Sequence, residues 1–163
     1  MEYVIRPIEE RDIPACTRLY NYYIRETTVS FEEEELSVDA FAARVRRISA
    51  EYPYLVAERD GQVVGYAYLD RYSERTAYRF TADLSIYVAH DCLAAGAGAA
   101  RLAEVERRGR AQGIRNIVSI ITGKNARSLG FHQKHGFREV GRLEQVGYKF
   151  GEWLDVIFMQ KNV

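Results

Sequence analysis

The sequence predicts an α/β (α+β) fold in which one mixed β-sheet is covered by helices. Apolar residues recur at helical spacing in some segments and alternate in others. The segments follow in the order strand, two helices, three strands, helix, strand, helix and two strands, which favours a single mixed sheet. No repeat or low-complexity linker interrupts the 163 residues, so we expect one domain over residues 1–163.

The N-terminal part begins with a strand over residues 2–8 and a helix over 11–26. Asp12 is expected to cap that helix, and proline at position 14 suits its first turn. A second helix is expected over 35–52, with Ser37 as its cap. Its apolar positions at helical spacing are Val38, Phe41, Val45 and Ile48. The acidic run 32–35 before it is expected to be a solvated loop.

The central and C-terminal parts alternate strands with helices. Residues 54–72 predict a hairpin around the turn Asp60-Gly61, and residues 81–89 predict a strand. A helix over 98–112 that ends near Gly113 precedes an apolar strand over 115–122. A short helix over 125–137 is expected to end at Gly136, and two strands follow over 138–161.

The composition excludes several classes of partner. Basic and acidic residues balance at 23 each, so no global charge favours nucleic acid or an anionic membrane. No apolar run approaches the roughly 20 residues that span a bilayer, and the N-terminus lacks the apolar core of a signal peptide. The two cysteines lie far apart and the three histidines have no clustered partners. These observations predict a soluble cytoplasmic protein without a metal site.

Residues 93–98, with the sequence LAAGAG, lie between an expected strand and an expected helix. The first N–H groups of a helix are unpaired and favour anions, and small side chains allow a ligand to approach the backbone. A loop that binds phosphate is therefore one interpretation. A tightly packed joint between strand and helix needs small residues too, so these six residues alone leave both interpretations open.

Four segments around this loop resemble the GNAT family of acyl-CoA-dependent N-acetyltransferases. They are IRPIEERDIPACTRLYNYY, YRFTADLSIYV, NARSLGFHQKHGF and VGRLEQVGYKFGEWLDVIFMQK, which together cover nearly the whole chain. The chain is most similar to the branch of phosphinothricin and methionine sulfoximine acetyltransferases. The resemblance implies a sheet of about seven strands that is splayed in the middle and takes acetyl-CoA into the opening.

The resemblance also implies which residues bind acetyl-CoA. The expected cofactor contacts are Ile86, Tyr87, Val88, Leu93, Ala94, Ala95, Gly96, Ala97, Gly98, Asn125 and Lys134. The chain departs from the family in the loop, because Leu93, Ala94 and Ala95 stand where the family carries arginine or glutamine and commonly a glycine and a basic residue. Backbone donors survive this change, so we expect weaker cofactor binding rather than none.

Acetyl transfer to an ammonium group requires a base, because ammonium has no lone pair. The branch uses a glutamate that aligns with Asp83, so the resemblance assigns the base to Asp83, which could otherwise be a polar residue on a half-buried strand. His132 takes the position of a tyrosine that protonates the leaving thiolate, although a structural histidine is the alternative. Backbone N–H groups near Ile86 and Tyr87 are the expected donors to the thioester oxygen.

The resemblance places Phe31, Arg75 and Tyr78 around a small amino-acid-like amine, and it implies a homodimer with aromatic residues near Tyr148 and Trp153 at the contact or the pocket edge. Arginines and aromatic walls suit an acceptor that carries a carboxylate. Two alternatives stay open: an acetyltransferase for another amine, such as a protein N-terminus or a polyamine, and a module that binds acyl-CoA without turnover.

Overall fold

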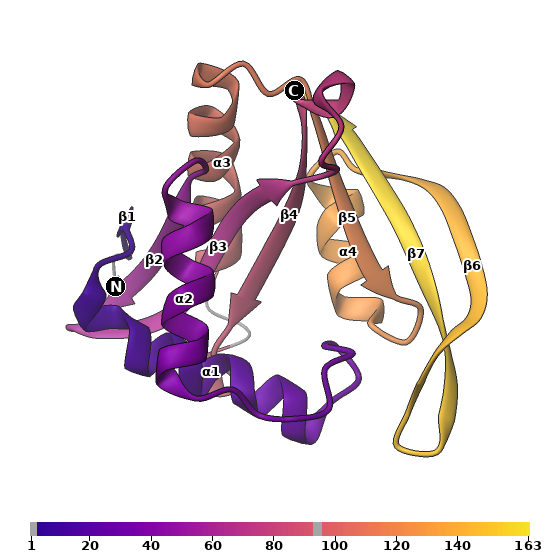
Figure 1. Ribbon diagram of the computed structural model, residues 1–163, viewed down its shortest axis with the longest axis horizontal. Helices are drawn as coiled ribbons and strands as arrows, with labels where there is room; N and C mark the ends of the chain where they lie inside the picture. The colour runs from indigo at the N-terminus through magenta and orange to yellow at the C-terminus, as the bar shows by residue number, and fades with distance from the viewer. Residues whose placement is uncertain (1–2, 93–95) are drawn as a thin grey trace.

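The computed structural model describes residues 3–92 and 96–163, which form one seven-stranded sheet (Figure 1). Its spatial order is β1-β2-β3-β4-β5-β7-β6. The strands are β1 (Val4–Pro7), β2 (Tyr54–Arg59), β3 (Gln62–Arg71), β4 (Thr81–Val88), β5 (Asn116–Thr122), β6 (Arg138–Lys149) and β7 (Glu152–Asn162). Only β4 and β5 pair in parallel, so the expected mixed sheet is confirmed.

The sheet is splayed between β4 and β5. These strands pair over three positions only, from Thr81 opposite Asn116 to Asp83 opposite Val118. Figure 1 shows them diverging beyond that point, so that the second half of β4 lies apart from β5. The splay expected from the family resemblance is therefore confirmed, and Asp83 lies where the two strands part.

Four α-helices cover the two faces of the sheet. They are α1 (Ile13–Glu26), α2 (Val38–Ser49), α3 (Ala97–Ala111) and α4 (Ala126–Lys134). Buried residues of α1 and α2, such as Phe41, pack with Tyr54 and Tyr66 on one face. Buried residues of α3, such as Leu102, pack with Ile117 on the other face, where Figure 1 also shows α4. Short 3-10 turns lie at Glu10–Asp12, Thr76–Tyr78 and His90–Cys92.

The N-terminal helices follow the sequence pattern with two corrections. Ser37 accepts a hydrogen bond from Ala40 N at 3.0 Å and caps α2, as expected. Asp12 stands at the N-cap position of α1 but makes no capping bond there. Its carboxylate instead accepts from Glu9 N at 2.8 Å and pairs with Arg6 at 2.7 Å. The Arg6 guanidinium outcompetes the helix amides because it offers a charged, bidentate partner.

The second correction concerns the acidic run before α2. Glu32 is half-buried and accepts hydrogen bonds from Tyr20 Oη and from Arg44 Nη1, the latter at 2.8 Å. Glu32 therefore ties the loop to both N-terminal helices, while the rest of the run is exposed. The expected hairpin between β2 and β3 is confirmed, and its turn residues Asp60 and Gly61 both adopt positive φ.

Candidate active site

Beyond Asp83 the inner edge of β4 pairs with no strand among the described residues, and its one side-chain contact given there is the hydrogen bond that Tyr23 Oη donates to Val88 O. Ala89 N donates to Val64 O at 2.8 Å, which sets the alternation of hydrogen bonds between β3 and β4. The N–H groups of Ile86 and Val88 therefore point toward the gap, whereas that of Tyr87 points toward β3. An extended ligand in the gap can pair with Ile86 and Val88 as an added strand does.

The side chains of β4 hold the strand rigidly on both faces. Ile86 packs against the core between the sheet and α3. On the other face, the Tyr87 ring lies 5.3 Å from Tyr20, 5.6 Å from Tyr23 and 5.3 Å from Tyr66, measured between centroids. Edge-on and tilted ring contacts of this kind stabilise a packed cluster. The open edge is therefore a fixed template for a ligand.

Asp83 has the environment of a general base. It lies opposite Asp70 of β3 and is the last residue of β4 that pairs with β5. Its Oδ1 atom is buried and has no hydrogen-bond partner among the described residues. Burial, with a further contribution from the charge of Asp70, raises the pKa of Asp83 from 3.8 to about 7. A carboxylate with that pKa can both take and release a proton near neutral pH.

A cleft beside Asp70 continues this polar region toward solvent. Its volume is about 440 Å³, and it lies between α2 and the connection from β3 to β4. Its lining residues are Arg47, Ala50, Glu51, Asp70, Arg71, Tyr72, Ser73 and Glu74. Sequence reasoning did not include Asp70 or Arg47 in the site. The alternation of residues along β3 places Asp70 on one face, but only the register between β3 and β4 brings it opposite Asp83.

The N-terminus of α3 lies next to α4. Gly96 precedes α3 with φ 76°, a left-handed conformation that glycine adopts without steric cost. Ala97 is buried, and a Cβ on Gly98 would lie 3.2 Å from the Phe131 ring of α4. The small residues of this helix start therefore serve close packing of the two helices. Leu93, Ala94 and Ala95 lie outside the described residues.

The predicted residues of α4 have different surroundings. Asn125 caps the helix, and its Oδ1 accepts from Ser128 N at 3.1 Å, so a cofactor contact would fall to its amide nitrogen. Lys134 is exposed in the last turn, one turn beyond Phe131. The expected role of both residues in binding acetyl-CoA stays a prediction.

His132 is buried against the Phe137 ring, and its Nδ1 lies 2.7 Å from Ser128 O. A carbonyl oxygen only accepts, so Nδ1 carries the hydrogen. Burial also lowers the pKa of His132, which favours the neutral ring. A neutral ring is a poor proton donor, so this environment favours the structural alternative, and the acid role stays a prediction.

The predicted acceptor residues fall in two places. Phe31 lies on the loop after α1 and is 40% exposed, next to Gly147 of β6. Arg75 and Tyr78 are exposed in the connection between β3 and β4, where the Tyr78 ring packs edge-on against Tyr72 at 5.4 Å. Figure 1 shows these two segments near opposite ends of β4. Within one chain, the structure therefore does not bring Phe31 together with Arg75 and Tyr78.

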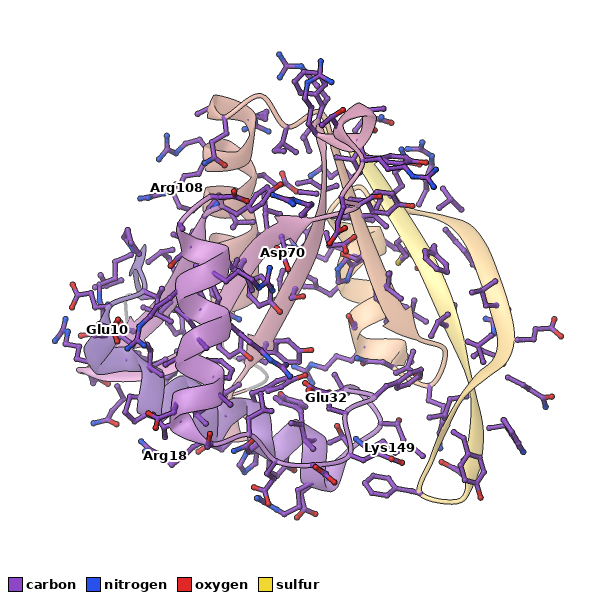
Figure 2. All side chains as sticks on the ribbon, in the orientation of Figure 1. Glu10, Arg18, Glu32, Asp70, Arg108 and Lys149 are labelled. Atoms are coloured by element: carbon purple, nitrogen blue, oxygen red, sulfur yellow. The ribbon has the colours of Figure 1, made fainter. Side chains whose placement is uncertain are left out.

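The loop that carries Phe31 is fixed by buried polar contacts. Lys149 of β6 is buried and donates from Nζ to Ser30 O at 2.6 Å. Burial lowers the pKa of Lys149, and the nearby carboxylates of Glu33 and Glu32 offset part of this shift. Figure 2 shows Glu32 and Lys149 near this loop, beside the open end of the sheet. The β6–β7 ribbon therefore holds the loop that carries Phe31.

Two classes of feature are absent from the described residues. Residues 3–92 and 96–163 contain no group of three or more histidine, cysteine, aspartate or glutamate side chains that could hold a metal ion. In the same part of the chain, no helix has the length and apolar character needed to cross a membrane.

A parallel strand pair that opens beside a helix N-terminus, with a buried carboxylate at the branching point, defines the class of acetyltransferases that use a splayed sheet. Comparison with known proteins agrees. The family model of the acetyltransferase (GNAT) domain matches residues 5–158, so the chain belongs to the GNAT acetyltransferase family. The protein is therefore an enzyme of the acyltransferase class.

Two relatives that are named for their acceptors match most of the chain. The chain is 39% identical to a phosphinothricin N-acetyltransferase of Alcaligenes faecalis, over 96% of this chain and 81% of the relative. The chain is also 37% identical to an L-methionine sulfoximine/L-methionine sulfone acetyltransferase of Pseudomonas paraeruginosa, over 98% of this chain and 94% of the relative.

Solved structures resemble the fold over the whole chain. A GNAT phosphinothricin acetyltransferase of Sinorhizobium meliloti in complex with acetyl-CoA superposes with a TM-score of 0.96 at 34% identity, covering 100% of this chain and 89% of that chain. The yncA acetyltransferase of Salmonella typhimurium, with its cofactor acetyl-CoA, gives a TM-score of 0.95 at 31% identity, covering 99% and 94%.

Proposed function

We propose that the protein transfers the acetyl group of acetyl-CoA to the amino group of a small amino-acid-like acceptor of the phosphinothricin, methionine sulfoximine or methionine sulfone type. The names of the relatives and the acetyl-CoA complexes of the solved structures support this choice. The observation that carries it is the buried Asp83 carboxylate at the point where β4 and β5 part. We place the reaction in the cytoplasm of the cell.

The gap between β4 and β5 fits acetyl-CoA, because the open N–H groups of Ile86 and Val88 are unused donors of the kind that a pantetheine amide accepts from. Ile86, Tyr87 and Val88 would hold that part of the molecule. The N-terminal N–H groups from Gly96 to Gly98 would hold its phosphates, because a helix N-terminus favours anions. Asn125 and Lys134 would contact it from α4.

Acetyl-CoA supplies an activated acetyl thioester to this reaction. Asp83 takes a proton from the acceptor ammonium, directly or through one water, and so produces the amine that attacks. The N–H of Ile86, on the open edge of β4, donates to the thioester oxygen as negative charge develops there. Both substrates are bound together, because burial raises the pKa of both free cysteines, Cys16 and Cys92, so neither is activated as a nucleophile.

The acceptor reaches Asp83 from the cleft lined by Arg47, Asp70 and Tyr72. The exposed Arg75 and Tyr78 lie in the same connection and can bind the acceptor's carboxylate and apolar portion. The loop that carries Phe31 lies near the other end of β4, so we assign Phe31 to an acceptor site shared between two chains.

The test is the release of free CoA thiol from acetyl-CoA with a panel of amines: phosphinothricin, methionine sulfoximine, methionine sulfone, a peptide N-terminus and a polyamine. We expect release with the first three. Release only with the peptide or the polyamine would replace the proposed acceptor class. Binding of acetyl-CoA without release from any amine would show a module without turnover.

Asp83→Asn tests the role of the base. The amide cannot take the proton, so kcat/KM should fall by roughly 10²- to 10⁴-fold while acetyl-CoA affinity stays within about twofold. Asp39→Asn, which removes an exposed carboxylate from α2, is the matched control and should keep full activity. An Asp83→Asn enzyme with wild-type turnover across the pH range would remove Asp83 as the base.

We further propose that the protein acts as a homodimer. The β6–β7 ribbon extends beyond the helices (Figure 1) and exposes a group of large apolar side chains. They are Val140, Leu143, Val146, Tyr148, Phe150 and Trp153. An exposed patch rich in aromatic residues at a sheet edge is typical of a protein interface.

A further inference from the structure

Asp70 and Asp83 share one polar site. They lie directly opposite each other on β3 and β4, so their side chains project to the same face of the sheet. The Cβ atoms of such a pair are about 5 Å apart. Two carboxylates at that separation repel each other, so one of them holds its proton more tightly.

The two carboxylates differ in their hydrogen-bond partners. Asp70 Oδ1 accepts from Arg71 N at 2.8 Å, and Arg47 of α2 lies 3.4 Å from each Asp70 oxygen. These donors hold the Asp70 carboxylate in place. Asp83 Oδ1 is buried without a partner in the described part of the chain, which favours its protonated form. The pair is therefore asymmetric, because Asp70 has donors on both oxygens and Asp83 Oδ1 has none among the described residues.

The other ionisable groups on this face leave Asp70 as the main charge near Asp83. Arg44 of α2 is paired with Glu32. Tyr68 of β3 is neutral, because burial raises its pKa. The neighbouring strand β5 places Val118 opposite Asp83 and contributes no charge there.

We propose that Asp70, held in place by Arg47 and by the N–H of Arg71, is a positioning residue that tunes Asp83 to take the acceptor's proton and to release it again. The proposal rests on the proposed function. Two protons leave the ammonium nitrogen in one turnover. Asp83 takes one and returns it to water in the cleft that Asp70 lines, and the other ends on the CoA thiol.

The pH dependence of kcat/KM for Asp70→Asn tests this role. Removal of the negative charge makes Asp83 easier to ionise, so the acid limb of the kcat/KM profile should move to lower pH by about one unit. At a given pH on that limb, kcat/KM should therefore rise about tenfold. The plateau at high pH should fall, because Asp83 becomes a weaker base. A merely structural role of Asp70 would lower activity at every pH without moving the limb.

Arg47→Gln supplies the opposite change. Without the guanidinium, Asp70 repels the charge on Asp83 more strongly, so the acid limb should move up. Arg46→Gln is the matched control, because Arg46 lies on the same helix as Arg47 but pairs with Glu10 and does not line the cleft. It should leave the limb in place. Shifts of the same sign in Asp70→Asn and Arg47→Gln would overturn the proposal.

A direct titration separates this inference from the proposed function. The Asp83 carboxyl carbon, followed by NMR in the wild-type chain and in Asp70→Asn, should titrate at lower pH in the variant, whether or not an acceptor is known. An unchanged titration would overturn the role of Asp70 even if Asp83→Asn abolished turnover. A shifted titration with no thiol release from any amine would instead overturn the proposed function alone.

Discussion

At the scale of single residues, the proposed reaction depends on the protonation state of the half-buried carboxylate of Asp83. Asp83 must be ionised to take a proton, and its pKa is raised to about 7 by burial and by the charge of Asp70. We therefore expect kcat/KM to be flat above this pH and to fall about tenfold for each pH unit below it. A kcat/KM profile with its acid limb near pH 4 would contradict this environment.

Arg101 of α3 is a buried charged residue whose burial costs free energy of folding. Its side chain is fully buried, and its three nitrogens have no hydrogen-bond partner among the described residues. Burial lowers the pKa of Arg101 to about 10, so the guanidinium is still charged at pH 7. Arg101→Met should raise the free energy of unfolding by about 1–3 kcal/mol, because it replaces a buried charge that has no partner among the described residues with an apolar chain of similar length.

Chemical denaturation measures this difference, and Arg110→Met is its control. Arg110 lies on the same helix but is exposed, so its replacement should change the free energy of unfolding by less than about 0.5 kcal/mol. An Arg101→Met variant less stable than the wild-type chain would mean that Arg101 has a stabilising partner.

The residue scale is also where prediction from the sequence reached its limit. Asp83 could be placed on the strand beside the opening because the surrounding motif TADLSIYV marks that strand, and its role as the base stays a prediction. Asp70 could not be placed, because its partner depends on the register of β3 against β4 across a nine-residue connection from 72 to 80. Likewise, Asp12 suited a helix cap, and only the folded position of Arg6 shows why it pairs elsewhere.

At the scale of elements, the loop that carries Phe31 packs against the β6–β7 ribbon at a glycine, Gly147. A Cβ on Gly147 of β6 would overlap the Phe31 ring, so Gly147→Ala must displace that ring. The φ of Gly147 is not positive, and alanine therefore acts only through this contact. We expect a KM for the acceptor that rises about 3- to 30-fold, with the KM for acetyl-CoA unchanged.

Gly141→Ala is the matched control for this experiment. Gly141 lies on the same strand, and a Cβ there meets no atom within 4 Å. It should leave both KM values unchanged. If Gly147→Ala left the KM for the acceptor unchanged as well, Phe31 would have no part in acceptor binding.

The succession of elements was predictable because each keeps one hydrophobic period along its length. Val45 and Ile48 of α2 are buried at helical spacing, as expected, while Val38 at the helix start is 45% exposed. The splay was expected only from the family resemblance. Apolar alternation in β4 continues to Val88, beyond the last residue that pairs with β5, so the pattern alone would predict pairing to the end of the strand.

At the scale of the whole molecule, the two edges of the sheet differ. The β1 edge is a short strand of four residues beside charged side chains, which protects it from pairing with another chain. The β6 edge is twelve residues long and exposes aromatic side chains, with Tyr148 directly opposite Trp153 of β7 and their rings 4.9 Å apart. One edge is therefore suited to solvent and the other to a second copy of the chain.

Trp153→Asp tests the proposed dimer, because a charge at the centre of an apolar interface is costly to bury. Sedimentation equilibrium should give twice the 18.8 kDa chain mass for the wild-type protein and a single chain mass for the variant. Val4→Asp, which places a charge on an equally exposed apolar residue of β1, should remain a dimer. A wild-type monomer at assay concentration, or a dimer that survives Trp153→Asp, would contradict this assembly. If the variant is a folded monomer whose KM for the acceptor has risen, the acceptor site is shared between two chains, which would explain why Phe31 and Arg75 lie near opposite ends of β4 within one.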